Sequence, residues 1–369
     1  MRGLALNEAY EDVKRLLLEF LVALDPREAK KRHVVCTPSF YLDHFLTVDD
    51  VGDFCRMLGG KCMAGGGNVP GFVQTVLSGG GGNNTAIGLA QLGLSSHFVG
   101  RTSELGFHIL KFFAGNSGVD ISHVKTDGRL GQTLALEIGQ KKVNVMLNDV
   151  GSNYDFGFDS LRDTDLELIE TSHLISVHDW GTNAVGGTDL AERGFEYAKQ
   201  YGVKTYFDSA DPSPRLADVP DLFRRIISSK NLDIMSMNQN ELQKHTGHTR
   251  VEHALEFKRQ IKARIDYHSP HYAVSIGDEA TFFPTFDVEL HRSTGAGDAW
   301  NSGNIFGELL DLSPPIRLCL ANAVAGYYVS SRRGAHPTVD DLVTFIQTKK
   351  LRRLTRALTA MRRIVENYG

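Results

Sequence analysis

The chain has few cysteines and no long apolar segment. Its 369 residues include four cysteines, none in a Cys-x-x-Cys pair, so we expect neither a structural zinc site nor a disulfide framework. Sparse, unpatterned cysteines are typical of a reducing compartment, and the N-terminus lacks the order of a signal peptide. The longest apolar candidate, residues 16–24, is interrupted by Glu19 and is too short to span a bilayer. These features predict a cytoplasmic protein that does not enter a membrane.

An excess of positive charge is also missing. The formal net charge is -4, which makes nucleic acid an unexpected partner. The phosphate-binding pattern G-x-x-x-x-G-K-[ST] is absent, which excludes a P-loop enzyme. No G-x-G-x-x-G follows the first predicted strand, which argues against a dinucleotide-dependent oxidoreductase. A hydrophobic content of 41% is ordinary for a soluble globular protein with a sizeable core.

Glycine, in contrast, is abundant, and the most informative glycines lie in the sequence Ser-Thr-Gly-Ala-Gly-Asp at 293–298, ahead of a predicted helix. Gly295 and Gly297 permit a tight turn and leave room for a ligand. The backbone N–H groups of Gly295, Ala296 and Gly297 can converge on an anion, where the helix dipole adds positive charge. Asp298 beside such an anion hole could act as a general base toward a hydroxyl; taken alone, it could equally be a helix cap.

A second glycine run, residues 79–82, opens another predicted helix that ends at Leu92-Gly93. The two segments together resemble signatures of the PfkB/ribokinase family of carbohydrate and nucleoside kinases. Over residues 33–345 the matching positions, in family order, are Gly79, Gly80, Asn84 and Leu92-Gly93; Asn238 and Glu241; Thr294 to Asp298, Trp300 and Gly303; and 321–326 with 332–335.

The resemblance implies an α/β fold, a ribokinase-like three-layer α/β/α sandwich with a mostly parallel central sheet. It implies a kinase domain over residues 33–369 with a small β-sheet lid, contributed by about residues 43–78 and 131–150. Residues 1–32 form an N-terminal helical extension outside the family core. A homodimer formed through the lid would be consistent with this organisation.

The residue pattern makes its own predictions. Apolar residues at helical spacing predict a helix over 7–30, ended by Pro26, that packs on the core or on a second subunit. Ten of the 24 residues in 59–82 are glycine, a density that disfavours regular helix. Alternation predicts lid strands at 133–138 and 143–147, joined by a turn at 139–142.

Beyond residue 155 the predicted strands and helices alternate, which indicates parallel strands with helices on both faces. Strands are predicted at 173–177, 203–207, 232–237, 272–276 and 281–283. Helices are predicted at 161–170, 187–201, 219–228, 239–246, 251–265, 298–310, 315–331 and 338–347.

The resemblance also assigns roles to individual residues. It implies that Asp43, Gly79, Gly80 and Asn84 bind the sugar, although Asp43 could be an exposed turn residue. Asn238 and Glu241 would order magnesium and phosphate, with Glu241 reaching the metal through water; the same pair also fits a helix capping box.

Nucleotide binding is assigned to Thr294, Gly277 and Asn322, although Asn322 could be an ordinary helix residue. The donor would be ATP, or ADP, with Mg²⁺. His178 to Gly181 follow a strand and could reach the substrate, but Trp180 could as easily belong to the core.

Three positions depart from the family pattern. Arg292 stands where the family usually has an Asp that helps to build a monovalent-cation site, so potassium activation is in doubt. The loop 100–106 is a shortened version of one that borders the sugar, and the glycine-rich lid segment is long. The sequence therefore predicts a nucleotide-dependent phosphotransferase for a sugar or sugar-like molecule. A nucleoside kinase is the alternative within enzymes, and a non-catalytic sugar or nucleotide sensor is the alternative of another class.

Overall fold

The structure is a computed structural model that describes residues 2–139 and 143–368. Its centre is a sheet of eight strands in the order β14-β13-β12-β11-β10-β9-β1-β4. The strands are β1 (His33–Thr37), β4 (Ser95–Phe98), β9 (Leu174–Val177), β10 (Lys204–Asp208), β11 (Ile234–Asn238), β12 (Arg264–His268), β13 (Tyr272–Ile276) and β14 (Ala280–Pro284). Six of them run parallel, whereas β13 and β14 are antiparallel to their neighbours.

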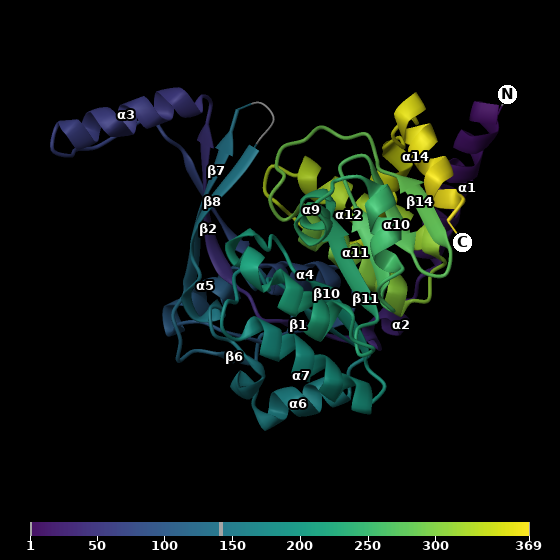
Figure 1. Cartoon of the computed structure of the whole chain (residues 1–369), viewed down its shortest axis with the longest axis horizontal. Helices are drawn as coiled ribbons and strands as arrows, with labels where there is room; N and C mark the ends of the chain where they lie inside the picture. The colour runs from purple at the N-terminus through teal and green to yellow at the C-terminus, as the bar shows by residue number, and fades with distance from the viewer. Residues whose placement is uncertain (1, 140–142, 369) are drawn as a thin grey trace.

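Helices cover both faces of this sheet (Figure 1), because its central strands are apolar on both sides. In β1, Val34 and Cys36 enter one core while Val35 enters the other. The first face carries α1 (Arg2–Ala23), α2 (Pro26–Lys30), α4 (Gly81–Gln91), α5 (Glu104–Ala114), α11 (Ala296–Leu309), α12 (Pro314–Ser330) and α13 (Val339–Thr348). The second carries α6 (Asp163–Glu170), α7 (Gly187–Gln200), α8 (Val219–Leu222), α9 (Gln239–Thr246), α10 (Val251–Lys258) and α14 (Arg356–Glu366). The expected three-layer α/β/α sandwich is confirmed.

A separate four-stranded sheet stands beside the main body, in the order β3-β2-β7-β8. Its strands are β2 (Tyr41–Val48), β3 (Gln74–Gly79), β7 (Gly131–Ile138) and β8 (Val143–Asp149). We call this sheet, with helix α3 (Val51–Met63) at its far end, the lid. The predicted turn between β7 and β8 falls largely on residues 140–142, which lie outside the described residues.

Several local predictions were wrong. Helix α3 runs through Gly59 and Gly60 despite their low helix propensity, because Asp50 caps its start by accepting from the Asp53 N–H at 2.8 Å. Helix α10 ends at Lys258, and β12 replaces the end of the predicted helix 251–265, since Ile265 and Tyr267 are buried against both neighbouring strands. Strand β4 and helices α5 and α14 were not predicted.

Pro26 does not end the first helix. Helix α1 stops at Ala23, and Pro26 occupies the first turn of the short helix α2, where a missing N–H costs nothing. Leu17 and Leu21 of α1 are buried in the same core as α12 and α13, so the extension packs on the kinase body. Within the described residues, no helix is long and apolar enough to cross a membrane.

Candidate active site

The glycine turn at 293–298 lies at the carboxyl end of the parallel strands, where α/β folds bind their ligands. Gly295 caps α11 with φ of 81°, a left-handed conformation that favours glycine. A Cβ at Gly295 would lie 2.3 Å from the Tyr328 hydroxyl oxygen of α12. The turn therefore requires glycine at this position for two independent reasons.

Asp298 lies in the first turn of α11, and its environment makes it an unusual carboxyl. The Asn84 side-chain amide of α4 donates to Asp298 Oδ2 at 2.9 Å. Burial, together with the charges of Asp179, Asp208 and Asp43, raises the pKa of Asp298 to about 8, against the lowering effect of the Asn84 hydrogen bond. A carboxyl with a pKa near the working pH is well suited to accept a proton from a hydroxyl group.

The backbone donors of the turn differ from one another. Among the described residues, the N–H groups of Gly295, Gly297 and Asp298 have no protein acceptor, whereas the N–H of Ala296 donates to the Ser293 carbonyl at 3.2 Å. The prediction that Ala296 contributes a free donor is therefore wrong, because the Ala296 N–H is used in the hydrogen bond that closes the turn. The N–H groups of Gly295, Gly297 and Asp298 are left to bind an anion.

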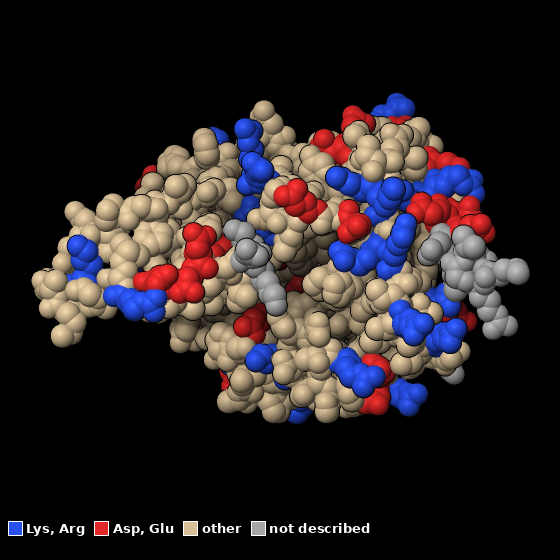
Figure 2. Space-filling view, turned by 90° about the horizontal axis from the view of Figure 1, so that it is seen from above, with Lys and Arg blue, Asp and Glu red and all other residues tan. Residues whose placement is uncertain are grey.

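Asp298 faces a cavity of about 500 Å³, called the acceptor cavity here, between the lid and the ends of the strands. Figure 2 shows the surface hollowed between the lid side and the main body. The side chains lining the cavity are mostly polar and come from both parts: Tyr41, Asp43, Asn84, Thr133, Asn144, Asn148, Asp179, Asp208, Glu241, Arg292, Thr294 and Asp298 are among them.

Of the four residues expected at the sugar, Asp43, Gly80 and Asn84 line this cavity, and Gly79 packs against Asp43. Asp43 is buried in β2, not exposed in a turn, and burial raises the pKa of its carboxyl to about 6. Gly79 makes room for it, since a Cβ there would lie 2.0 Å from Asp43 Oδ2. Gly80, with φ of 94°, passes so close to the Ser39 carbonyl that a Cβ would lie 2.5 Å from its oxygen.

Three further carboxylates, those of Asp179, Asp208 and Asp211, line the acceptor cavity. None was assigned a role from the sequence, although Asp179 lies in the segment 178–181 that was expected to reach the substrate. Asp179 follows β9 with φ of 55°, and its Oδ2 accepts from the Gly81 N–H at 2.6 Å and from the Ser39 hydroxyl. Asp208 ends β10 and accepts from the Asn301 side-chain amide at 2.5 Å. Their positions at the ends of parallel strands were the available signal. Trp180 next to Asp179 is a core residue with 1% exposure.

Asn238 and Glu241 form the capping box of α9, with the Asn238 N–H donating to Glu241 Oε2 at 2.8 Å. Both residues also line the acceptor cavity, so the capping role does not exclude a functional one. Burial and the nearby charge of Asp208 raise the pKa of Glu241 well above its ordinary value. A cation placed beside the carboxylates of Asp208 and Glu241 would relieve the repulsion between them.

A second cavity of about 500 Å³, called the donor cavity here, lies on the other side of the glycine turn. Its lining is mainly apolar and includes Pro270, Phe286, Val288, Leu290, Trp300, Ala325, Gly326 and Val329. Asn238, His268, Ser293, Ala296 and Gly297 line both cavities, so the two meet at the turn that carries Asp298.

The three residues expected at the nucleotide lie in different places. Asn322 lines the donor cavity, but its amide already donates to the Pro284 carbonyl at 3.1 Å and accepts from the Trp300 indole at 3.0 Å. Thr294 lines the acceptor cavity, and its buried hydroxyl has no partner among the described residues.

Gly277 lines neither cavity. It follows β13, and this strand runs antiparallel to β12, so its last residue Ile276 pairs with Ile265 near the opposite end of the sheet. The structure therefore contradicts a role for Gly277 at the nucleotide.

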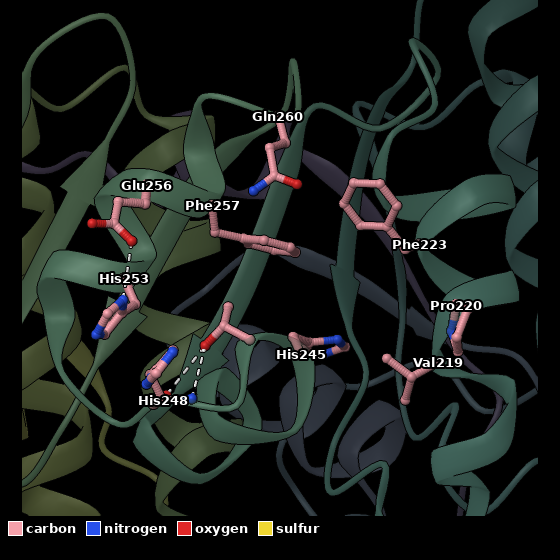
Figure 3. A pocket seen from close by; sticks show the side chains of 10 residues that line it. Val219, Pro220, Phe223, His245, His248, His253, Glu256, Phe257 and Gln260 are labelled. Carbon is pink, nitrogen blue, oxygen red and sulfur yellow. Dashed lines mark hydrogen bonds and ion pairs between the residues drawn. The ribbon is translucent and has the colours of Figure 1, made fainter.

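A third cavity, of about 580 Å³, lies near the far end of α9 and is shown in Figure 3. His245, His248 and His253 line it with Phe223 and Phe257, and none of the predicted site residues does. In the described part of the chain, no three His, Cys, Asp or Glu side chains are placed to hold a metal ion. Neither these histidines nor the acceptor cavity thus provides a protein-only metal cage.

The fold is an α/β sandwich with a lid, and a polar and an apolar cavity meet at the glycine turn 293–298 beside the half-buried carboxyl of Asp298. This arrangement is that of a phosphotransferase for small molecules. A family model described as pfkB family carbohydrate kinase matches residues 57–341. The chain belongs to the pfkB family of carbohydrate kinases and is a sugar kinase.

Among curated proteins, it is 25% identical over 296 residues to a 5-dehydro-2-deoxygluconokinase of Geobacillus thermodenitrificans, an alignment that covers 73% of this chain and 84% of the relative. The corresponding enzyme of Lacticaseibacillus casei is 26% identical over 293 residues, covering 72% and 84%.

Solved structures show the same fold at lower identity. An Arabidopsis thaliana ribokinase complexed with ribose and ATP superposes with a TM-score of 0.67 at 18% identity, covering 86% of this chain and 99% of that one. An adenosine kinase from Sinorhizobium meliloti gives a TM-score of 0.68, also at 18% identity, with the same coverage.

Proposed function

We propose that this sugar kinase transfers the terminal phosphoryl group of a nucleotide to a hydroxyl of its acceptor, with Asp298 as the general base. The observation that carries the proposal is the meeting of the two cavities at the turn 293–298. An acceptor hydroxyl on one side and a terminal phosphate on the other would approach each other across Gly297, as in-line transfer requires.

In this mechanism Asp298 accepts the hydroxyl proton as the bond to phosphorus forms. The Asn84 amide orients the carboxylate through its 2.9 Å hydrogen bond. The N–H groups of Gly295, Gly297 and Asp298 stabilise the negative charge of the transferring group. Asp43 and Asp179 would hold the other hydroxyls of the acceptor, since carboxylates accept readily from neighbouring hydroxyl pairs.

The donor is proposed to be ATP, with its base in the apolar donor cavity, although ADP would fit the same chemistry. Mg²⁺ would be held through water by Glu241, and it would neutralise charge on the phosphates. Water-mediated binding fits a cavity in which carboxylates are close but no group of three is placed to hold a metal among the described residues.

The acceptor is proposed to be 5-dehydro-2-deoxygluconate or a closely related sugar acid, because that is the substrate in the name of the relatives at 25–26% identity. Residues 33–369 would form the kinase domain, working in the cytoplasm. The proposal is tested by measuring phosphoryl transfer from ATP and from ADP to a panel of sugar acids, neutral sugars and nucleosides. Turnover confined to nucleosides would make the protein a nucleoside kinase, and ligand binding without turnover would make it a sensor.

The pH dependence of kcat/KM should report the pKa of Asp298 in the free enzyme. The pKa is raised to about 8, so the base is increasingly protonated as the pH falls below that value. We expect kcat/KM to fall about tenfold per pH unit below pH 8 and to level off above it. A profile that stays flat from pH 6 to 9 would contradict the role of Asp298 as base.

The outer face of the lid predicts self-association. In β8 the residues Asn144, Met146 and Asn148 line the acceptor cavity, whereas Val145 and Leu147 on the other face are 43% and 58% exposed. A second copy of the lid would bury these side chains. We expect a dimer by light scattering, and a monomer for Leu147→Asp. The control Val22→Asp, at an exposed position of α1, should remain dimeric; a monomeric native protein would refute the prediction.

A further inference from the structure

We propose that Arg292 is the subsite for the carboxylate group of the acceptor and selects sugar acids over neutral sugars. This inference rests on the proposed function and adds to it the residue that recognises the acid. Arg292 directly precedes the glycine turn and lines the acceptor cavity together with Asp43 and Asp298. It is the position at which this chain has a cation where the family pattern has a carboxylate.

The guanidinium of Arg292 is buried and unsatisfied. The residue is 5% exposed, yet among residues 2–139 and 143–368 no hydrogen bond or ion pair engages its guanidinium, and its Nε is buried without a partner. A buried charge without a partner destabilises the folded protein strongly. Proteins keep such a group where a ligand completes it.

The surroundings of Arg292 leave one direction free for a ligand. Its guanidinium lies 4.9 Å from the Phe45 ring centre and 5.3 Å from that of Tyr328, so aromatic rings cover the group. A Cβ at Gly334 would lie 1.8 Å from Arg292 Nη1, so the backbone closes that edge as well. The remaining edge faces the acceptor cavity that Arg292 lines.

The acidic lining of the acceptor cavity explains why an acceptor with a carboxylate would need Arg292 to bind. Its lining includes the acidic side chains of Asp43, Asp179, Asp208, Asp211, Glu241 and Asp298, whereas among the residues that the structure describes Arg292 is the only Lys or Arg that lines it. An acidic acceptor would be repelled unless its carboxylate met a cation. A planar guanidinium suits that task, because it binds a carboxylate through two parallel hydrogen bonds. The charge of Arg292 acts to lower the pKa of Asp43, against the raising effect of burial, but the two side chains form no ion pair.

The test is calorimetric binding of 5-dehydro-2-deoxygluconate and of its C1 amide, which lacks the negative charge. The native protein should bind the acid about 30- to 100-fold more tightly than the amide. Arg292→Gln should reduce this ratio to within about threefold, and Arg292→Lys should retain part of it, because lysine keeps the charge without the planar fork.

Arg215→Gln is the matched control. The side chain of Arg215 is only 9% exposed and stacks 3.9 Å from the Trp180 ring centre, but it donates to the carbonyls of Trp180 and Asn183 at 3.0 and 2.7 Å. Its loss should lower the melting temperature and leave the ratio of acid to amide binding unchanged.

An equal loss of acid and amide binding in Arg292→Gln, or a native protein without preference for the acid, would overturn the inference. Binding requires no phosphoryl transfer, so a failure of the kinase proposal would show separately as absent turnover. Turnover of neutral sugars without acid preference would leave the kinase standing and remove the Arg292 subsite.

Discussion

Replacing Asp298 with Asn is expected to lower kcat by about 10²- to 10⁴-fold, since a positioned general base contributes about that much. The amide keeps the size of the side chain but cannot accept the hydroxyl proton. KM for nucleotide and acceptor should change little, because the turn and both cavities remain. Steady-state kinetics at saturating acceptor would measure the effect.

Asp179→Asn is the matched control for this variant. Asp179 is likewise a half-buried carboxyl of the same cavity, but it is held by the Ser39 hydroxyl and by the Gly81 N–H. Its loss should raise the KM for the acceptor more than it lowers kcat. A kcat that falls equally in both variants would mean that general charge removal, not loss of the base, explains the result.

The same Asp298 substitution should stabilise the protein. Asp298 has a folded-state pKa of about 8 against about 3.9 in an unfolded chain. Between these values the folded state holds a proton that the unfolded state has lost, so stability falls as the pH rises and the cost is fully present above pH 8. We expect Asp298→Asn to melt at a higher temperature than the native protein at pH 8, with a smaller difference at pH 5. A lower melting temperature at pH 8 would contradict the assigned burial of the charge.

Replacing Gly295 with Ala is expected to lower kcat by about 10²- to 10³-fold, comparable to the loss of an oxyanion-hole donor. The new Cβ would meet the Tyr328 hydroxyl at 2.3 Å, and the φ of 81° would be strained. The turn would have to open, which moves the N–H groups that face the phosphate. Nucleotide titration and rapid-quench kinetics would separate weaker binding from slower transfer.

Gly194→Ala serves as the comparison for Gly295→Ala. Gly194 lies inside α7, and a Cβ there would have no neighbour within 4 Å. This change should preserve kcat and stabilise the helix slightly, because alanine restricts the unfolded chain. Native activity in Gly295→Ala would show that the geometry of the turn is not needed for transfer.

The parts of the site that follow from contiguous sequence were predictable. Glycines mark the turn 293–298 and the run that begins at Gly79 as tight turns at the start of helices. Asn238 and Glu241 have the spacing of a helix capping box. The alternation of strands and helices after residue 155 indicated the parallel sheet. Each of these features depends on neighbours within one or two turns of chain, which is the range at which residue patterns are informative.

The parts that depend on distant segments were not predictable. The direction of β13 follows from its pairing with β12, so nothing local to Gly277 shows that it lies near the opposite end of the sheet from the cavities. The pKa of Asp298 depends on Asp43, Asp179 and Asp208, which come from three separate strand ends.

The surroundings of Arg292 illustrate the same limit. Phe45 and Tyr328 reach its guanidinium from the lid and from α12. The sequence marked Arg292 as a departure from the family pattern, but only the folded chain places it at the acceptor cavity, without an ion-pair partner among the described residues.

The role of Asp298 as general base is tested most directly by a rapid-quench measurement of transfer from ATP labelled in its γ-phosphate to 5-dehydro-2-deoxygluconate, with the native protein and Asp298→Asn side by side. Nucleotide and acceptor binding would be measured on the same samples. If Asp298 has this role, the native protein gives stoichiometric label in the sugar phosphate, and the variant transfers the label at a rate lower by orders of magnitude with both ligands still bound. Transfer at the native rate by Asp298→Asn would contradict this role.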